Sequence, residues 1–461
     1  MRQIGKYEIR GLLGKGGMGR VYKARLPVVG KIVALKALEP DPLLARLMGA
    51  ATVEGLFIGE AVTLGRLRHP NIVALLDFET HGERPYYTME YYAHNLGDML
   101  GESFMAERPS RPLDADRALN YTAQILRGLA CLHHAGIVHR DIKPFNILIT
   151  EYERIKLCDF GLSKLRGESY GGPSNLNVGS PFYAAPEQER DPDSAGPPAD
   201  LYAVGVMFYR MLTGQLPPEG GGGPQPVARF NLDLDDQWDA FIAKATATAP
   251  EKRFQTAARM LSALTRIERH WERQKANTCA LPLDEPVDPP IRATALGSRT
   301  EANVGLRSTP IKVRVGAARE TFELDALWRP RRYRRPQISP DGADLVMDTA
   351  NGLLWQRAGS PYPLDWQTAR ESVATLNREG FADRTDWRLP TMAELLALVL
   401  PPARGRALCQ PPLFDPRQKW LWSADTKSFQ AAWHINLELG YAGWADRSSR
   451  LYLRAVCGPV L

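Results

Sequence analysis

The segment 139–146, with the sequence HRDIKPFN, constrains the fold of this chain more than any other stretch. It places a carboxylate (Asp141), an ammonium group (Lys143) and an amide (Asn146) in one short loop. A run of this kind can arise by chance, so its meaning depends on whether matching segments lie elsewhere at suitable distances. If they do, the chain must fold so that several remote loops converge on these three side chains.

A glycine-rich stretch lies near the N-terminus, between two strand-like runs. Residues 14–21 have the sequence GKGGMGRV and follow the strand-like run 7–13. Glycines let backbone N–H groups approach phosphate oxygens, because no Cβ stands in the way. A dinucleotide-binding turn would also satisfy this pattern, but there a helix should follow, whereas residues 21–24 are typical of a returning strand. The stretch therefore predicts a phosphate-covering hairpin.

Three further segments follow in a fixed order. They are VALK at 33–36, DFG at 159–161 and APE at 185–187. Together with the glycine-rich stretch and HRDIKPFN, they resemble the motifs of bacterial eukaryotic-type Ser/Thr protein kinases. The resemblance implies an α+β, bilobal protein-kinase fold with a β-rich N-lobe and a helical C-lobe. It also implies an enzyme that transfers the γ-phosphate of ATP to protein serine or threonine, with Mg²⁺ or Mn²⁺.

The resemblance assigns the nucleotide-binding residues. Lys36 would hold the α- and β-phosphates, although any single lysine at a strand end is more often simply exposed. Glu60, in the helical run 57–64, would pair with Lys36. The turn at 69–73, which ends this helix in the family, selects Glu60 over Glu54. The other residues expected to contact ATP are Gly14, Lys15, Gly16, Gly17, Met18, Gly19, Val21, Ala34, Met89, Glu90, Tyr92 and Leu148.

The same resemblance gives roles to the loops around the reacting groups. Asp141 would accept or orient the proton of the substrate hydroxyl. Lys143 would stabilise charge on the transferring phosphoryl group. Asn146 and Asp159 would bind the metal ion, since a hard cation prefers oxygen ligands.

Further residues are candidates for support and regulation. Asp200 would tie down the backbone of the catalytic loop, and Glu187 would form a buried ion pair with Arg253. Arg140 would sense a phosphate on the activation loop, because a phosphoryl group adds nearly two negative charges. A hydroxyl at Ser180 is typical of specificity for serine or threonine. Ser169 and Ser174 are candidates for autophosphorylation; the alternative is that they belong to a merely solvated polar loop.

Amino-acid composition and hydrophobic periodicity divide the chain into three regions. With 461 residues, 44% hydrophobic and 24% charged, it is long enough for two or three globular domains. Residues 7–271 alternate strand-like and helix-like runs and form the kinase-like domain. Residues 272–335 are rich in Pro, Ser, Thr and Arg, which predicts a flexible linker. Residues 336–461 are rich in tryptophan, which indicates a second compact domain.

Composition also bounds the surroundings of the protein. No apolar run approaches the length of about 18 residues that a membrane span needs. Five scattered cysteines, an odd number, favour a reducing compartment over a disulfide framework. The net charge of +6 comes partly from a local arginine cluster at 329–335 and not from a basic face. We therefore expect a cytoplasmic protein without nucleic-acid or membrane partners.

The tryptophan-rich region has motifs of its own. Asn351-Gly352 predicts a hairpin turn, and Thr391 with Glu394 predicts a capping box at the start of a helix. DWRLPT at 386–391, with the closing strand-like end of the chain, resembles the Lcl C-terminal domain family. That family is similar in fold to C-type lectins and the formylglycine-generating enzyme. The resemblance implies a small α+β C-type-lectin-like domain with an unknown ligand or protein partner, since fold alone does not give function.

Three expectations concern the interior of this region. A metal site would need clustered ligands, yet His434 is the only histidine after the linker, so we expect none. Relatives of this fold often carry disulfides, so Cys409 and Cys457 could pair, but a cytoplasmic location favours free thiols. The tryptophans are expected to form the core and not a ligand platform.

The resulting prediction is a Ser/Thr protein kinase of bacterial signalling that autophosphorylates and carries a C-terminal sensing or recruiting domain. Dimerisation is one route to autophosphorylation. The alternative is a nucleotide-binding pseudokinase or adaptor scaffold. That alternative predicts the loss of one of the reacting or metal-binding residues, and all of them are present: Lys36, Asp141, Asn146 and Asp159.

Overall fold

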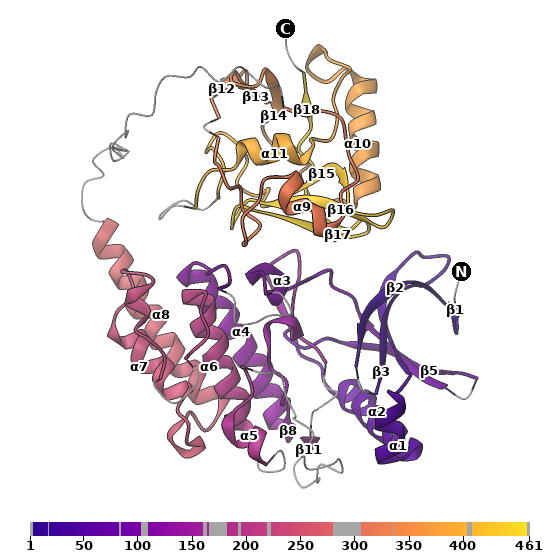
Figure 1. The fold of residues 1–461 in the computed structure, drawn as a ribbon, viewed down its shortest axis with the longest axis vertical. Coiled ribbons are helices and arrows are strands. Elements are labelled where there is room, and N and C mark those ends of the chain that lie inside the picture. The colour runs from indigo at the N-terminus through magenta and orange to yellow at the C-terminus, as the bar shows by residue number, and fades with distance from the viewer. Residues whose placement is uncertain are drawn as a thin grey trace. The chain divides into compact units, whose positions relative to one another are not determined.

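The chain forms two compact units, Met1–Leu281 and Pro282–Leu461 (Figure 1). Each has its own hydrophobic core, and each is described by itself. The structure, a computed structural model, describes residues 3–16, 18–82, 84–102, 109–159, 164–165, 182–191, 195–218, 223–279, 306–334, 336–402 and 408–458.

An antiparallel sheet with the strand order β1-β2-β3-β4-β6-β5 begins the first unit. Alternate residues of a strand face opposite sides of the sheet. On the central strand β4, Val33, Leu35 and Ala37 therefore join the core of the sheet, while Lys36 faces the other side, toward helix α2. The elements are β1 (Gln3–Ile4), β2 (Tyr7–Lys15), β3 (Gly19–Arg25), β4 (Ile32–Leu38), α1 (Pro42–Met48), α2 (Ala50–Arg66), β5 (Leu75–His81) and β6 (Arg84–Glu90).

Helix α2 turns one face toward the sheet. Its buried residues recur every three or four positions, as on one side of a helix. Gly49, with a φ of 82°, ends α1 and allows the chain to turn into α2. Glu60 is thereby directed inward. The buried residues of the helix are Val53, Phe57, Glu60, Ala61, Thr63 and Leu64.

Helices form the second part of the first unit (Figure 1). They are α3 (Leu96–Leu100), α4 (Ala115–His134), α5 (Pro186–Arg190), α6 (Pro197–Thr213), α7 (Asp236–Ala245) and α8 (Ala257–Cys279). Helix α6 is buried over nearly its whole length, including Asp200, which is 1% exposed. A β-rich part followed by a helical part agrees with the predicted bilobal fold.

Short elements in the helical part carry the loops of the candidate site. The 3-10 helix η1 lies directly after the loop that holds Asp141 and Lys143. Strand β9 follows η1 and is the central strand of the sheet β10-β9-β7. Strand β8, which precedes the loop, pairs with β11. Their bounds are β7 (His94–Asn95), β8 (Ile137–Val138), η1 (Pro144–Asn146), β9 (Ile147–Ile149), β10 (Ile155–Leu157), β11 (Lys164–Leu165), η3 (Val227–Arg229) and η4 (Pro250–Lys252).

The second unit combines two antiparallel sheets with three α-helices. One sheet has the strand order β12-β13-β14-β18, and the other has the strand order β15-β16-β17. The elements are α9 (Val315–Thr321), β12 (Ile338–Asp341), β13 (Leu345–Asp348), β14 (Leu353–Gln356), α10 (Trp366–Glu379), η5 (Phe381–Asp383), α11 (Met392–Leu398), β15 (Trp420–Thr426), β16 (Ala431–Asn436), β17 (Tyr441–Asp446) and β18 (Val456–Cys457).

Local predictions for the second unit are confirmed. Gly352, with a φ of 64°, ends the turn between β13 and β14, in which Asp348 pairs with Leu353. Thr391 and Glu394 form the reciprocal capping box of α11. Most tryptophans are core residues, with Trp444 the most exposed of those in this unit at 37%. The tryptophans at 5% exposure or less are Trp355, Trp366, Trp387, Trp422 and Trp433.

The predicted linker, 272–335, is too long at both ends. Residues 272–279 complete α8. Residues 306–334 belong to the second unit, because Val313, Ala318 and others from this stretch lie in one of its core clusters. Arg307 anchors the stretch through an ion pair with the fully buried Asp425, at 2.7 Å. The second unit therefore begins before the start at 336 that composition indicated.

Two negative findings apply to the described residues. None of the helices there combines the length and apolar character needed to cross a bilayer. The thiols of Cys409 and Cys457 are both free, as are those of Cys131 and Cys158.

Candidate active site

Lys36 and Glu60 form a buried ion pair between β4 and α2. Nζ of Lys36 donates to both carboxylate oxygens of Glu60, each at 2.8 Å, and the two side chains are 8% and 3% exposed. Burial alone would lower the pKa of Lys36, but the carboxylate of Glu60 leads the opposing effects and raises this pKa well above its ordinary value. The ammonium group therefore stays charged at neutral pH, as phosphate binding requires.

The predicted phosphate-covering hairpin lies between β2 and β3. Gly16 N donates to Gly19 O at 2.9 Å at its tip. A Cβ on Gly19 would collide with the carbonyl oxygen of Ala37, whereas a Cβ on Gly14 would meet no heavy atom within 4 Å. Packing thus requires a glycine at 19, while Gly14 leaves open space beside the backbone. The hairpin also holds Lys15 and Met18, and Gly17 lies outside the described residues.

Residues expected around adenine come from four strands, β3, β4, β6 and β9, and from the segment after β6. Val21 on β3 pairs with Lys36, and Ala34 on β4 pairs with Met89 on β6. Leu148 lies on β9 and is partly buried. Val21 therefore lies opposite Lys36 in the sheet, and Ala34 is two residues before it on the same face of β4. Tyr92, two residues after β6, is partly buried, and burial raises its pKa.

Lys156 is a residue of this region that sequence reasoning missed. Its Nζ donates to Glu90 Oε2 at 2.9 Å, and the same oxygen accepts from Ala74 N at 3.1 Å. Glu90 is therefore fixed to β10 and to the segment before β5. No motif or periodicity marks Lys156, because its partner lies 66 residues away in the chain.

The catalytic loop brings its three predicted groups into contact. Nζ of Lys143 donates to Oδ2 of Asp141 at 2.7 Å. Nδ2 of Asn146 donates to the same oxygen at 2.9 Å and to the carbonyl oxygen of Asp141 at 2.8 Å. Two donors from within the loop therefore hold the carboxylate of Asp141, which is 8% exposed as a residue.

Asp200 supports this loop from beneath, as expected. Its Oδ2 accepts from His139 N at 2.9 Å and its Oδ1 accepts from Arg140 N at 2.8 Å. His133 Nε2 lies 2.8 Å from Oδ2. Burial would raise the pKa of Asp200, but the hydrogen bond with His133 and the facing N–H groups hold it below its ordinary value. Arg140 has a φ of 67°, a conformation that costs a non-glycine residue about 1–3 kcal/mol, and Asp200 stabilises it.

Asn146 and Asp159 are the two residues expected to bind a metal ion. Cys158 N donates to Asn146 O at 3.1 Å, which places Asp159 beside the loop. The carboxylate of Asp159 is half exposed and lies 3.8 Å from Nζ of Lys36. Nδ2 of Asn146 is engaged with Asp141, which leaves its Oδ1 as an oxygen ligand. Among the described residues no three His, Cys, Asp or Glu side chains cluster; two oxygen ligands fit Mg²⁺ that also binds substrate phosphates.

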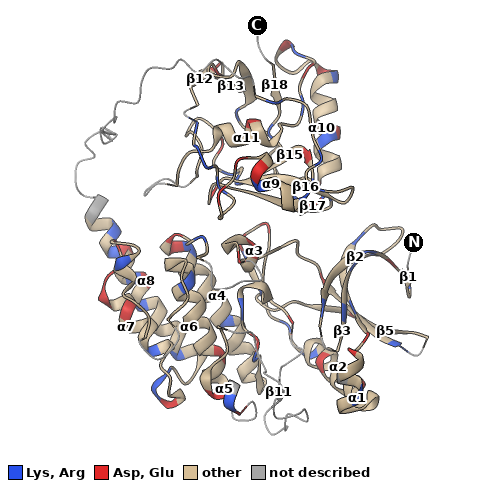
Figure 2. Cartoon of the chain, in the orientation of Figure 1, with Lys and Arg blue, Asp and Glu red and all other residues tan. Residues whose placement is uncertain are grey.

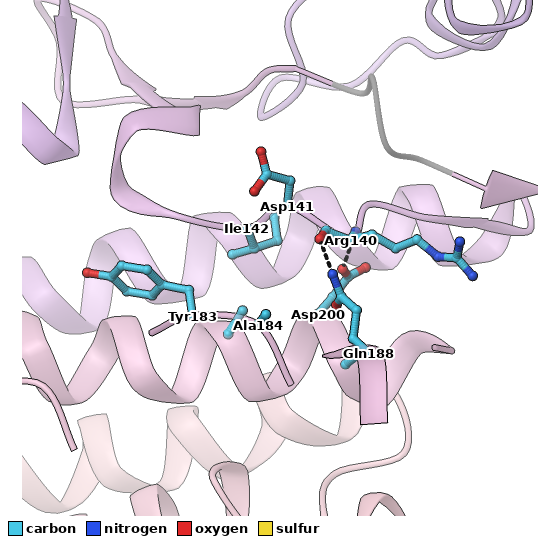
Figure 3. Close-up of a pocket in the computed structure, with 9 residues that line it drawn as sticks. Arg140, Asp141, Ile142, Tyr183, Ala184, Gln188 and Asp200 are labelled. Atoms are coloured by element: carbon cyan, nitrogen blue, oxygen red, sulfur yellow. Dashed lines mark hydrogen bonds between the residues drawn. The ribbon is translucent and has the colours of Figure 1, made fainter. Parts of the chain in front are cut away.

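A small pocket lies under the catalytic loop (Figure 3). It is lined by Asp141, Ile142 and Tyr183, among others. Gln188 Nε2 closes one side by donating to Arg140 O at 2.6 Å.

Tyr183 belongs to a second network that sequence reasoning missed. Its hydroxyl donates to Glu102, which also pairs with Arg210 of α6 at 2.6 Å. The side chains of Glu102 and Arg210 are 3% and 1% exposed. Burial raises the pKa of Glu102, and Arg210 opposes the rise. The network joins three parts of the first unit. Tyr183 lies just before α5, Glu102 lies two residues after the end of α3, and Arg210 lies on the buried helix α6.

Arg253 pairs with Glu187 as predicted. Nη1 and Nη2 donate to the two carboxylate oxygens at 2.7 and 2.8 Å, a bidentate arrangement. Three backbone carbonyls, among them those of Ala247 and Thr248, accept the other N–H groups. The predicted hydroxyls of Ser169, Ser174 and Ser180 lie outside the described residues.

Comparison with known proteins agrees with this geometry. Residues 7–269 match the model of the protein kinase domain, and residues 344–457 match that of the Lcl C-terminal domain. Serine/threonine-protein kinase PknB of Mycobacterium tuberculosis is 35% identical over 280 residues, which are 57% of this chain and 43% of PknB. PrkC of Bacillus subtilis, also named a serine/threonine-protein kinase, is 34% identical over 270 residues, 56% of this chain and 40% of PrkC.

A relative from Myxococcus xanthus, serine/threonine-protein kinase pkn3, is 31% identical over 291 residues, 58% of this chain and 51% of pkn3. The chain thus spans about half or less of the length of these relatives. The crystal structure of the PknI kinase domain of Mycobacterium tuberculosis is similar at 24% identity with a TM-score of 0.43, covering 57% of this chain and 97% of that one. Because the kinase model covers more than half of its residues, this chain belongs to the protein kinase domain family.

Proposed function

We propose that this protein is a serine/threonine protein kinase that transfers the γ-phosphate of ATP to hydroxyl groups of proteins. The observation that carries the proposal is the arrangement of Asp141, whose Oδ2 receives Lys143 Nζ at 2.7 Å and Asn146 Nδ2 at 2.9 Å. The Lys36–Glu60 ion pair, formed at 2.8 Å, supports it. The relatives named serine/threonine-protein kinases support the choice of acceptor.

The proposed roles follow from these contacts. Lys36 binds the α- and β-phosphates of ATP, with Glu60 fixing the position of its Nζ. Asp141 orients the acceptor hydroxyl and takes up its proton, while Lys143 counters the charge that develops on the transferring group. Asn146 and Asp159 would hold Mg²⁺ or Mn²⁺, which neutralises charge on the β- and γ-phosphates when bound.

Regulation is proposed at the activation loop. Autophosphorylation at Ser169 or Ser174 would place a dianion near Arg140, the residue adjacent to Asp141. Arg140 is held in place by Asp200 and Gln188, so a phosphate paired with it would act on a fixed point of the catalytic loop. Ser180 would bond Asp141 and Lys143 and favour serine or threonine as acceptor. A dimer would let one chain phosphorylate another.

The second unit is proposed to sense a ligand or recruit a protein for the kinase in bacterial signalling. Its core is separate from that of the first unit, which supports an independent binding function. A cytoplasmic location fits a protein that uses ATP and has free thiols at Cys409 and Cys457.

Incorporation of labelled phosphate tests the proposal. The full chain is incubated with radiolabelled ATP, Mg²⁺ and a general protein substrate, in parallel with Lys36→Met and Asp141→Ala. We expect labelling by the wild type and at most about a hundredth of it with either variant. Lys31→Met is a matched control, since Lys31 is an exposed lysine just before β4, and it should label like the wild type. Equal labelling by all four proteins would refute the kinase proposal.

A further inference from the structure

Two arginines of the second unit share one tryptophan. Cζ of Arg370 lies 5.0 Å and Cζ of Arg447 lies 4.1 Å from the ring centroid of Trp366, the first residue of α10. The indole itself is fixed, because its Nε1 donates to Ser423 O at 2.9 Å and its backbone N donates to Arg447 O at 2.9 Å. A rigid, 5% exposed ring therefore gathers two guanidinium groups at one place.

Neither guanidinium group forms an ion pair with any carboxylate that the structure describes. The acidic residues next to them in sequence accept hydrogen bonds from other residues: Glu371 accepts from Gln367 Nε2, and Asp446 accepts from Ser448 N. Nε of Arg447 is buried and has no hydrogen-bond partner among the described residues. Burial lowers the pKa of Arg447, and the nearby charge of Arg370 lowers it further. The carboxylate of Asp446 acts in the opposite direction and raises this pKa, so the repulsion between the two guanidinium groups is only partly offset.

A buried hydroxyl lies in the same turn. Ser449, two residues after Arg447, is 4% exposed, and its Oγ has no hydrogen-bond partner in the described part of the chain. Arg370, by contrast, is exposed on α10, one of the elements on which Figure 2 shows basic positions. A solute can therefore reach the guanidinium group of Arg370 from solvent.

We propose that Arg370 and Arg447 bind the phosphate group of a phosphorylated serine or threonine in a protein segment. Guanidinium groups match phosphate oxygens with paired N–H donors. A phosphate monoester carries nearly two negative charges at neutral pH, so it offsets the repulsion between both arginines, whereas a sulfate ester carries one.

A phosphorylated protein is the source of this group because the proposed function of the first unit makes that product, and the inference rests on that function for its biological meaning. The second unit would then retain proteins that already carry phosphate, including another copy of this chain. Binding itself is independent of catalysis, since the ligand can be supplied already phosphorylated.

Fluorescence anisotropy with the wild-type full chain, without ATP, tests the site. The probes are a labelled Gly-Gly-phosphoserine-Gly-Gly peptide and the same peptide with serine or O-sulfoserine. We expect binding of the phosphoserine peptide alone, competed by inorganic phosphate and weakened by added salt. Arg370→Gln should weaken it about tenfold or more, because a charge-assisted contact is lost.

Arg378→Gln is the matched control, since Arg378 is another exposed arginine of α10, two turns further along, and it should leave the affinity unchanged. Arg370 is exposed, so its replacement does not threaten folding, and an unchanged melting temperature checks this. Equal binding of the three peptides, tighter binding of the sulfoserine peptide, or no effect of Arg370→Gln would overturn the proposal. None of these outcomes depends on whether the chain phosphorylates anything.

Discussion

Replacement of Asp200 by asparagine should release the catalytic loop from helix α6. Both carboxylate oxygens of Asp200 are acceptors, for His139 N at 2.9 Å and for Arg140 N at 2.8 Å. An asparagine has one oxygen and one NH₂ group, so one of these N–H donors must face another donor. The substitution therefore removes a hydrogen bond to a charged acceptor and leaves a buried donor unsatisfied, although it changes the volume of the side chain very little.

The size of the effect follows from these two losses. A hydrogen bond to a charged group contributes about 1.5–3 kcal/mol, and an unsatisfied buried donor costs about 1–3 kcal/mol. We therefore expect the free energy of opening of the loop to fall by about 2.5–6 kcal/mol. Since about 1.4 kcal/mol is a factor of ten, the amides of His139 and Arg140 should exchange about 10² to 10⁴ times faster.

Hydrogen–deuterium exchange of a peptide spanning 137–147, followed by mass spectrometry, measures this directly. Phosphate transfer should fall in parallel, because Arg140 and Asp141 are adjacent. The pKa of Asp200 is lowered in the fold, so its contribution is complete above the unfolded value near 3.8 and is lost only below it. Measurement at pH 7 therefore compares a fully ionised wild type with the variant.

Asp236→Asn is the matched control for this experiment. Asp236 is exposed in the first turn of α7, and its loss should change stability by at most about 0.5 kcal/mol. If Asp200→Asn left exchange of the 137–147 peptide within about threefold of the wild type and activity unchanged, support of the loop by Asp200 would be refuted.

Two other predictions concern the domain boundary and a buried thiol. A fragment starting at 306 should fold and melt cooperatively, whereas one starting at 336 should not, because it lacks α9 and the Arg307–Asp425 ion pair. Equal melting temperatures of the two fragments would show that residues 306–335 belong to the linker after all. Cys158 should resist alkylation at pH 8 in the native chain and react fast in urea, since burial raises its pKa well above its ordinary value; a native rate equal to that in urea would contradict its burial.

Sequence reasoning reached the parts of the site that are coded by short motifs. Asp141, Lys143 and Asn146 lie within six residues, so their contact is largely a local property of the loop. The Lys36–Glu60 pair spans 24 residues, and the resemblance to the kinase family selected it through the spacing of Glu60 from the turn at 69–73. Turn and cap chemistry likewise predicted Gly352 and the Thr391 capping box.

What it missed depends on contacts between distant segments. Lys156 and Glu90 are 66 residues apart, and Arg307 and Asp425 are 118 apart. Nothing in the neighbourhood of either residue in the chain signals the partner. The stretch 306–334 was assigned to the linker for the same reason. It has few periodic apolar positions, and its order comes from packing against strands that follow 80 or more residues later. One such contact is the hydrogen bond that Val313 N donates to Thr426 O at the end of β15.

Phosphate transfer with Asp141 replaced by asparagine tests the central claim most directly. The turnover rate and the ATP dissociation constant are measured for the wild type and for Asp141→Asn at the same Mg²⁺ concentration. We predict that the variant loses a factor of about 10² to 10⁴ in rate while it binds ATP as tightly as the wild type, because Asp141 acts on the acceptor hydroxyl and not on the nucleotide. Equal turnover by the two proteins would contradict the assignment of this loop as the site of phosphoryl transfer.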